Sequence, residues 1–192
     1  LHEDRDIIVV NKIPGLLTIA TDTDRDRTAY QLLTHYVRKG CAKSRERIFI
    51  VHRLDRETSG VLVFARTEEA KRQLQSNWDE TEKHYLAVVH GTLAKKEGTI
   101  TSHLTENAAF RVYSTPDQSV GKVARTAYKV VRETRAFSLL DVLLLTGRKH
   151  QIRVHLAGIG HPIAGDAGYG ARTDPLRRLA LHAHVLGFDH PR

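Results

Sequence analysis

Short apolar runs separated by turn residues constrain the fold of this chain more than any other feature of its sequence. DIIVV at 6–10, VLVFA at 61–65 and YLAVV at 85–89 have the length and the β-branched content of buried strands. Further strands are predicted at 48–51, 98–104, 109–114, 125–132 and 137–145, and 16–19 is expected to pair back on the first run.

Helical spacing of apolar residues occurs in fewer places. It predicts helices at 28–39, at 68–80 and over about ten residues from Lys149, with a last helix and strand in 174–189. Because strands outnumber helices and short turns join most of them, we predict an α+β fold with a mixed, mainly antiparallel sheet flanked by helices. At this length one domain spanning 1–192 is the default.

The charge and the cysteine content narrow the class of protein. The formal net charge of +8 favours a polyanionic partner, with nucleic acid ahead of a membrane surface. No apolar run approaches the roughly 20 residues of a membrane-spanning helix. Cys41 is the only cysteine, which suits a reducing cytoplasm. The chain starts at Leu1 and contains no methionine, so a preceding segment is considered, and a monomer is the base expectation.

The stretch HRLDRETSG at 52–60 places one carboxylate, Asp55, between Arg53 and Arg56. A lone aspartate in a turn usually does no more than bond nearby backbone N–H groups. Here the turn joins two strongly apolar strands, so it lies at the edge of the core, and the flanking arginines would keep Asp55 ionised. A fixed, partly desolvated carboxylate can serve as a nucleophile or a base.

Two further polar stretches do not fit an ordinary surface. In KHYLAVVHG at 83–91, Tyr85 is either a packing residue or a ring that stacks on a nucleobase. In TGRKHQIRVHL at 146–156, three cations and two histidines occur without an acid, and apolar residues interleave with them. Such an uncompensated cluster predicts a bound anion, and Arg153 is expected near the buried boundary, where a carboxylate partner would be favourable.

Metal and nucleotide sites are not predicted. The chain has 12 histidines, but no HExxH occurs, and His182 with His184 has no apparent third ligand. No glycine-rich loop of the Walker or dinucleotide type is present, and Ser59 lacks the GxSxG elbow of a serine hydrolase.

Taken together, the polar blocks carry a specific resemblance. HRLDRETSG resembles the signature of the RluA family of RNA pseudouridine synthases. KHYLAVVHG, LLTGRKHQIRVHL, GHPIAGDAGYG and LALHAHVLGFDHP follow in the family's order, so the resemblance extends from Asp6 to Pro191. It implies a sheet in two halves with a central active-site cleft. Many members also carry an N-terminal S4 RNA-binding domain, and this sequence contains none.

The resemblance also implies roles for individual residues. Asp55 matches the catalytic aspartate, Tyr85 the tyrosine that stacks on the target base, and Arg153 the basic residue that pairs with the aspartate. Arg53 matches an arginine that engages the RNA around the flipped nucleotide. The remaining expected RNA contacts are Arg56, Arg148, Lys149 and Ile152, of which Ile152 is expected to pack beneath the base.

Pseudouridine formation moves the glycosidic bond of uridine from N1 to C5 without gain or loss of atoms. The implied enzyme therefore needs no cofactor and no metal, and its partner is a ribosomal or transfer RNA stem-loop. Two other interpretations stay open at this point. One is a hydrolase that uses Asp55 with water, and the other is a non-catalytic RNA-binding module, which would explain the charge but not the carboxylate.

Overall fold

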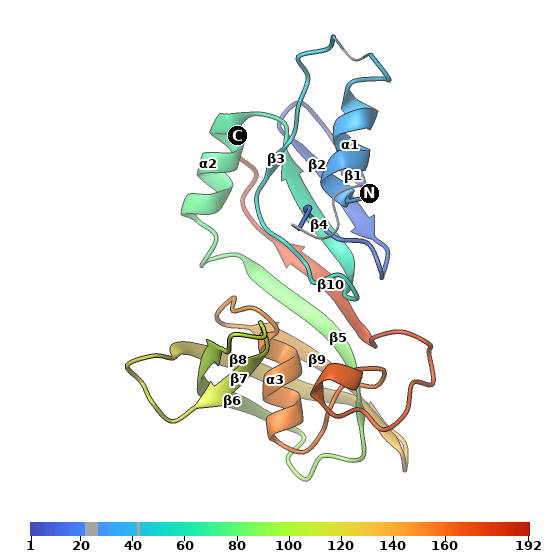
Figure 1. The fold of residues 1–192 in the computed structure, drawn as a ribbon, viewed down its shortest axis with the longest axis vertical. Coiled ribbons are helices and arrows are strands. Elements are labelled where there is room, and N and C mark those ends of the chain that lie inside the picture. Colours follow the sequence, from blue (N-terminus) through green and yellow to red (C-terminus); the bar gives the residue numbers. More distant parts are fainter. Residues whose placement is uncertain (22–26, 42) are drawn as a thin grey trace. The chain divides into compact units, whose positions relative to one another are not determined.

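The computed structural model describes residues 1–21, 27–41 and 43–192. It contains two compact units, Leu1–Thr81 with Leu186–Arg192, and Glu82–Val185 (Figure 1). Ten strands, three α-helices and one 3-10 helix occur in the described residues, and every named strand pair with a printed register is antiparallel. The predicted α+β fold with a mainly antiparallel sheet in two halves and flanking helices is therefore confirmed.

The first unit contains one half of the sheet. Its strands are β1 (His2–Glu3), β2 (Ile7–Lys12), β3 (Phe49–Ile50) and β4 (Ser59–Ala65). The order is β1-β2-β4, and β3 also pairs with β4. The apolar runs of β2 and β4 lie opposite each other, with Ile8 facing Phe64 and Val10 facing Leu62. Ile7 and Ile8 of β2 and residues 62–65 of β4 are buried, which accounts for the apolar character of both runs.

Two capped helices belong to the first unit. Helix α1 (Ala29–Val37) begins with a capping box between Thr28 and Gln31, and α2 (Glu68–Ser76) begins with the Thr67 hydroxyl accepting from the Ala70 N–H. Caps of this kind contribute about 1 kcal/mol each. Ala70 and Leu74 of α2 are buried with residues of β2 and β4, so this helix covers part of the core.

The second unit contains the other half of the sheet. Its strands are β5 (Glu82–His90), β6 (Glu97–Glu106), β7 (Val112–Thr115), β8 (Lys122–Glu133), β9 (Phe137–Leu144) and β10 (Leu181–Gly187). The order is β10-β5-β9-β8-β6-β7, and the last two residues of β10 belong to the first unit. Helix α3 (Gln151–Gly158) contacts β6, β7, β8 and the 3-10 helix η1 (Ala167–Tyr169) (Figure 1).

Three local predictions differ from the structure. Strand β1 was not predicted, and Leu17, expected in a returning strand, forms only an isolated parallel bridge with Thr28. The helix predicted within 174–189 is wrong, because only β10 forms there. The charged stretch at 22–27 also has the composition of a polar loop, and all of it except Arg27 lies outside the described residues.

Backbone bonds explain why no helix forms before β10. The Ala180 N–H donates to Ala164, and the Val88 N–H of β5 donates to the Ala180 carbonyl, so this part of the chain pairs with its neighbours. The Arg178 carbonyl oxygen also lies 2.1 Å from where a Cβ on Gly165 would be, an approach that only glycine permits. Tertiary pairing therefore overrides the local helical pattern.

None of the helices in the described part of the chain is long and apolar enough to cross a membrane.

A buried histidine joins α3 to the sheet of the second unit. His155 is 2% exposed, and its Nδ1 and Nε2 lie 2.8 Å and 3.0 Å from the hydroxyls of Thr126 on β8 and Ser102 on β6. A neutral imidazole satisfies both hydroxyls, since it offers one donor and one acceptor. Burial lowers the pKa of His155 to about 4, so the folded chain holds this ring neutral.

We predict that His155 contributes to acid destabilisation. The unfolded chain takes up a proton near pH 6.5, whereas the folded chain does so only near pH 4. The stability is therefore complete above about pH 6.5 and is lost as the pH falls toward 4, by roughly 3 kcal/mol. Imidazole NMR signals recorded from pH 7 to 5 should show His155 neutral throughout. A midpoint above pH 6 would contradict the prediction.

Candidate active site

The segment that connects β3 to β4 carries Asp55. Val51, Leu54 and Thr58 are buried, Arg53 and Arg56 are exposed, and Asp55 itself is half-buried. The Thr58 N–H donates to the Asp55 carbonyl at 3.2 Å, which closes a turn before β4 begins. The carboxylate therefore lies where the core of the first unit meets solvent, as the sequence predicts.

Two buried side chains fix the backbone on both sides of Asp55. The Thr18 hydroxyl accepts from the Leu54 N–H at 3.1 Å and donates to the Leu54 carbonyl at 2.9 Å. The Lys12 ammonium, on a residue only 2% exposed, donates to the Arg56 carbonyl at 2.9 Å and to two carbonyls of the turn after β2. Because buried polar groups are costly to leave unpaired, these bonds restrict the segment to one conformation.

A third contact holds the start of the same segment. His52 accepts the Val63 N–H at its Nε2, over 3.1 Å, and its ring centroid lies 4.5 Å from that of Trp78. Since Nε2 accepts in this bond, the proton of the neutral ring is on Nδ1. His52 therefore joins the start of the Asp55 segment to strand β4.

Tyr85 lies in β5 of the second unit, opposite Val142 of β9. It is half-buried and packs against the core cluster that includes Ile152 of α3. The neighbouring His84 points to the other face of the strand, where its Nδ1 lies 2.9 Å from the Asp141 carboxylate. That hydrogen bond raises the pKa of His84. Strand alternation thus directs Tyr85 to the face that α3 covers.

Arg153 of α3 forms a bidentate ion pair with Asp166. Its Nε donates to Oδ2 at 2.8 Å and its Nη2 donates to Oδ1 at 2.9 Å. The side chains are 16% and 1% exposed, so the pair is largely removed from water. The sequence predicts Asp55 as the carboxylate partner of Arg153, and that pairing stays a prediction, whereas Asp166 is a partner within the second unit itself.

Tyr169 completes the surroundings of Arg153. The guanidinium carbon lies 4.8 Å from the centroid of the Tyr169 ring, and the phenol oxygen lies 2.9 Å from Nδ1 of His150. Burial raises the pKa of Tyr169, so the phenol stays protonated at neutral pH. Two residues therefore fix the Arg153 guanidinium: the Asp166 carboxylate and the Tyr169 ring.

The residues predicted to contact RNA differ in solvent exposure and in whether another part of the protein already binds their side chains. Arg53 and Arg56 are exposed beside Asp55. Lys149 forms an ion pair with Glu106, and the Arg148 Nε donates to the Val123 carbonyl at 3.1 Å. Ile152 is 4% exposed and belongs to the hydrophobic core of the second unit.

Several structural residues of the site were not anticipated. Asp166 and Tyr169 lie within GDAGYG, a block that carries the family resemblance but to which the sequence assigned no role. Lys12 lies just beyond the strand predicted at 6–10, yet it is the last residue of β2 and its side chain is buried. No local sequence pattern indicates the role of Thr18, because its hydrogen bond to Leu54 spans 36 residues of sequence.

One group of potential metal ligands occurs in the described residues, and none of the expected catalytic residues belongs to it. Ligand atoms of Asp4, Asp6 and His190 lie within 4.8 Å of one another. Asp6 is paired with Arg192 at 2.7 Å, and Asp4 is paired with His190 at 3.0 Å. The group therefore joins the two ends of the first unit through internal ion pairs, and it does not suggest a metal centre.

Comparison with known proteins agrees with the motifs. Residues 6–158 match the model of a family described as RNA pseudouridylate synthase. The chain is 39% identical over 196 residues to the "Uncharacterized RNA pseudouridine synthase YlyB" of Bacillus subtilis (strain 168), covering 100% of this chain and 64% of the relative. It is 40% identical over 205 residues to "Ribosomal large subunit pseudouridine synthase D" of Nitrosomonas europaea, covering 100% of this chain and 58% of the relative.

The chain thus spans less than two thirds of the length of these two relatives. Among solved structures, "Human RNA Pseudouridylate Synthase Domain Containing 4" is similar with a TM-score of 0.81 and 25% identity, covering 97% of this chain and 82% of that one. "Human RNA Pseudouridylate Synthase Domain Containing 1" gives a TM-score of 0.76 at 28% identity, over 96% and 76% of the two chains. This chain belongs to the RNA pseudouridylate synthase family, and its motifs are those of the RluA branch.

Proposed function

We propose that this chain isomerises uridine to pseudouridine in RNA, with Asp55 as the catalytic carboxylate. The observation that carries the proposal is the fixed backbone of the Asp55 segment, which Lys12, Thr18 and His52 hold from the protein side. A turn that only connects two strands at the surface does not require buried side chains to fix its backbone on both sides, as Lys12 and Thr18 do here. Precise positioning of a catalytic carboxylate requires such contacts, since small misplacements are costly to the rate.

The reaction breaks the bond between C1′ and N1 of uridine and forms a bond between C1′ and C5. The base leaves as an anion, turns, and rejoins the sugar, after which a proton leaves C5 and N1 is protonated. An ionised Asp55 can stabilise or trap C1′, remove the C2′ proton, or attack C6 of uracil. All three routes need an ionised Asp55 beside the target nucleoside, and none needs a redox step.

Tyr85 and Arg153 are the proposed partners of Asp55 in one catalytic domain spanning residues 1–192. The half-buried ring of Tyr85 offers a face on which the detached uracil can stack while it turns. Arg153 supplies a cation whose direction is set by Asp166 and Tyr169. An arginine held in this way loses little side-chain entropy when it meets an anion.

The proposed substrate is a stem-loop of ribosomal or transfer RNA, and ribosomal RNA is the first to test, because a relative is named for the large ribosomal subunit. The target base must flip out of its stack, at a cost of a few kcal/mol. Phosphate contacts from Arg53, Arg56, Arg148 and Lys149 offset part of that cost. We expect the chain to act in the cytoplasm, as a monomer and without metal, which gel filtration and assays in EDTA would test.

We predict that Asp55→Asn lowers turnover by roughly 10²- to 10⁴-fold while RNA binding is largely kept. The amide keeps the shape of the side chain but cannot act as a nucleophile or base. Tritium release from RNA labelled at C5 of uridine measures isomerisation, and fluorescence anisotropy of a labelled stem-loop transcript measures binding. Unchanged turnover would eliminate Asp55 as the catalytic group.

The same assays separate the two other functions. A hydrolase would shorten the RNA or release free base, and both products are visible after electrophoresis and chromatography in EDTA. A binding module would release no tritium with any transcript, including RNA isolated from cells that lack the protein. Either result would replace the proposed activity.

A single substitution of Arg153 does not separate its catalytic role from its structural role, because it leaves the buried Asp166 without a counter-ion. A pair of variants is therefore needed. We predict that Arg153→Gln alone lowers the free energy of unfolding by about 3–5 kcal/mol. Arg153→Gln with Asp166→Asn should recover part of that stability, since both charges are gone. Turnover should stay low in the double variant if Arg153 acts in catalysis. Recovery of both stability and turnover would show that Arg153 is only structural.

A further inference from the structure

We propose that α1 and the described residues that follow it form a second RNA-backbone site, separate from the residues that act on the target uridine. The proposal rests on the proposed function for its choice of RNA as the ligand. Three independent features of the first unit support it, namely the local charge, a pocket beside the helix, and a buried hydroxyl without a partner.

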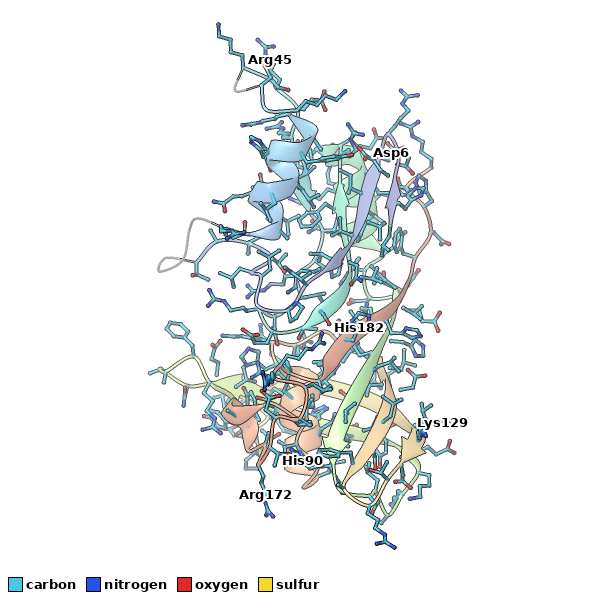
Figure 2. The ribbon with its side chains drawn as sticks, turned by 90° about the vertical axis from the view of Figure 1, so that its right-hand side faces the viewer. Asp6, Arg45, His90, Lys129, Arg172 and His182 are labelled. Carbon is cyan, nitrogen blue, oxygen red and sulfur yellow. The ribbon has the colours of Figure 1, made fainter. Side chains whose placement is uncertain are left out.

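Local charge is the first feature. Five cations occur between His35 and Ile48 against one acid, Glu46, so this stretch carries a formal +4 of the chain's +8. The cations are Arg38, Lys39, Lys43, Arg45 and Arg47. All but Arg38 are exposed, and Figure 2 shows Arg45 extending outward from this part of the chain. Such a concentration of charge repels itself unless an anion compensates it.

Internal partners do not neutralise most of these cations. Lys39, Lys43 and Arg45 form no ion pair with any residue that the structure describes. The Glu46 carboxylate lies 3.8 Å from Arg66, a cation outside the stretch. The contrast with Lys149, whose ammonium pairs with Glu106, is informative. Charge near the third motif is partly neutralised within the protein, whereas charge after α1 is left for an external anion.

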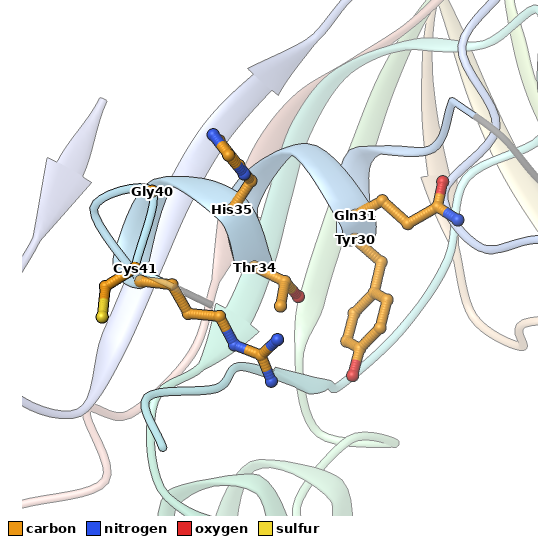
Figure 3. A pocket seen from close by; sticks show the side chains of 7 residues that line it. Tyr30, Gln31, Thr34, His35, Gly40 and Cys41 are labelled. Atoms are coloured by element: carbon orange, nitrogen blue, oxygen red, sulfur yellow. The ribbon is translucent and has the colours of Figure 1, made fainter. Parts of the chain in front are cut away.

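A pocket of about 370 Å³ is the second feature. It is lined by Tyr30, Gln31, Thr34, His35, Arg38, Gly40 and Cys41. Figure 3 shows Tyr30 and Thr34 projecting from one side of α1 and Cys41 just beyond its C-terminal end. The volume is within the range of small-molecule sites, about 300–1,000 Å³, so one unit of an RNA backbone is a suitable occupant.

The third feature is the hydroxyl of Thr34, a residue that lines this pocket. Its Oγ1 is buried and has no hydrogen-bond partner among the described residues. A hydroxyl buried in that way costs about 1–3 kcal/mol unless a ligand satisfies it. Tyr30 lines the same pocket, whereas the Gln31 Oε1 accepts from the Thr28 N–H and hydroxyl at the cap of α1. The Tyr30 phenol and the Thr34 hydroxyl are therefore the polar groups that would recognise a ribose 2′-hydroxyl.

Arg38 links the pocket to the basic residues that follow α1. Lys39 and Gly40 adopt φ of +49° and +72°, which turns the chain back at the end of α1. The Arg38 Nε then donates to the Glu46 carbonyl at 3.0 Å, which closes the loop that carries the exposed cations. Arg38 thus lines the pocket and fixes the loop at once. Phosphate would bind to the loop and ribose to the pocket, as in sequence-independent RNA contacts.

Charge removal tests the site. Lys39→Gln, Lys43→Gln and Arg45→Gln, combined in the Asp55→Asn background, should weaken binding of a labelled stem-loop transcript with a single-stranded extension by at least about tenfold. The slope of log affinity against log salt should fall by about 0.7–0.9 for each phosphate contact that is lost. With an active Asp55, the same triple variant should raise KM and leave kcat unchanged.

The matched control removes three exposed cations from β8: Lys122→Gln, Lys129→Gln and Arg132→Gln (Lys129 is labelled in Figure 2). If both triple variants lost RNA affinity equally, the loss would come from the lower net charge alone, and the proposal would be overturned. Because binding is read without turnover, the outcome stands whether or not the chain proves to be a pseudouridine synthase. Loss of isomerisation with full binding would instead point to the catalytic residues.

Cys41 provides a direct probe, since it is the only cysteine, is exposed, and lines the pocket. The transcript should slow its alkylation by a maleimide dye at least about tenfold, and the triple variant should abolish this protection. Inorganic phosphate alone should protect weakly. Protection by phosphatidylglycerol vesicles but not by RNA, or no protection by either, would overturn the assignment to RNA.

Discussion

The packing of α3 against the sheet is the interaction that positions the motif residues of the second unit. The helix has eight residues, and its N-cap residue, His150, adopts a left-handed conformation without a side-chain cap. A helix this short is marginal by itself, so tertiary contacts must position it. The buried Gln151 amide donates to the Arg125 carbonyl and to the Thr126 hydroxyl, both at 2.9 Å. The buried His155 bonds Thr126 as well, so two turns of the helix are joined to one strand.

This arrangement of α3 explains why one stretch of sequence serves both packing and chemistry. Gln151 and His155 face the sheet, Ile152 enters the core, and Arg153 points to Asp166. Only the direction of each side chain around the helix separates these tasks. The family signature is therefore a packing motif as much as a catalytic one. A change at Gln151 would displace Arg153 without touching it.

The sequence predicted the class of fold because the strand signals were strong and local. The runs that became β2, β4 and β5 are apolar and short, and each was found within a few residues of its bounds. Residue-level partners were harder, since they depend on contacts distant in sequence. Lys12 reaches the Arg56 carbonyl across 44 residues, and no local pattern predicts a buried lysine there. Asp166 was missed for a different reason, because a carboxylate in a glycine-rich turn usually bonds its own backbone.

The structure also separates cations that look equivalent in the sequence. Lys149 and Arg45 are both exposed and basic, yet one is paired with Glu106 and the other has no acidic partner among the described residues. An ion pair must be broken before its lysine can bind a phosphate, so Lys149 gains less from RNA than its charge suggests. Net charge therefore indicates that a polyanion binds, whereas the pairing of each cation indicates where. By that criterion RNA contacts extend beyond the motifs to the chain after α1.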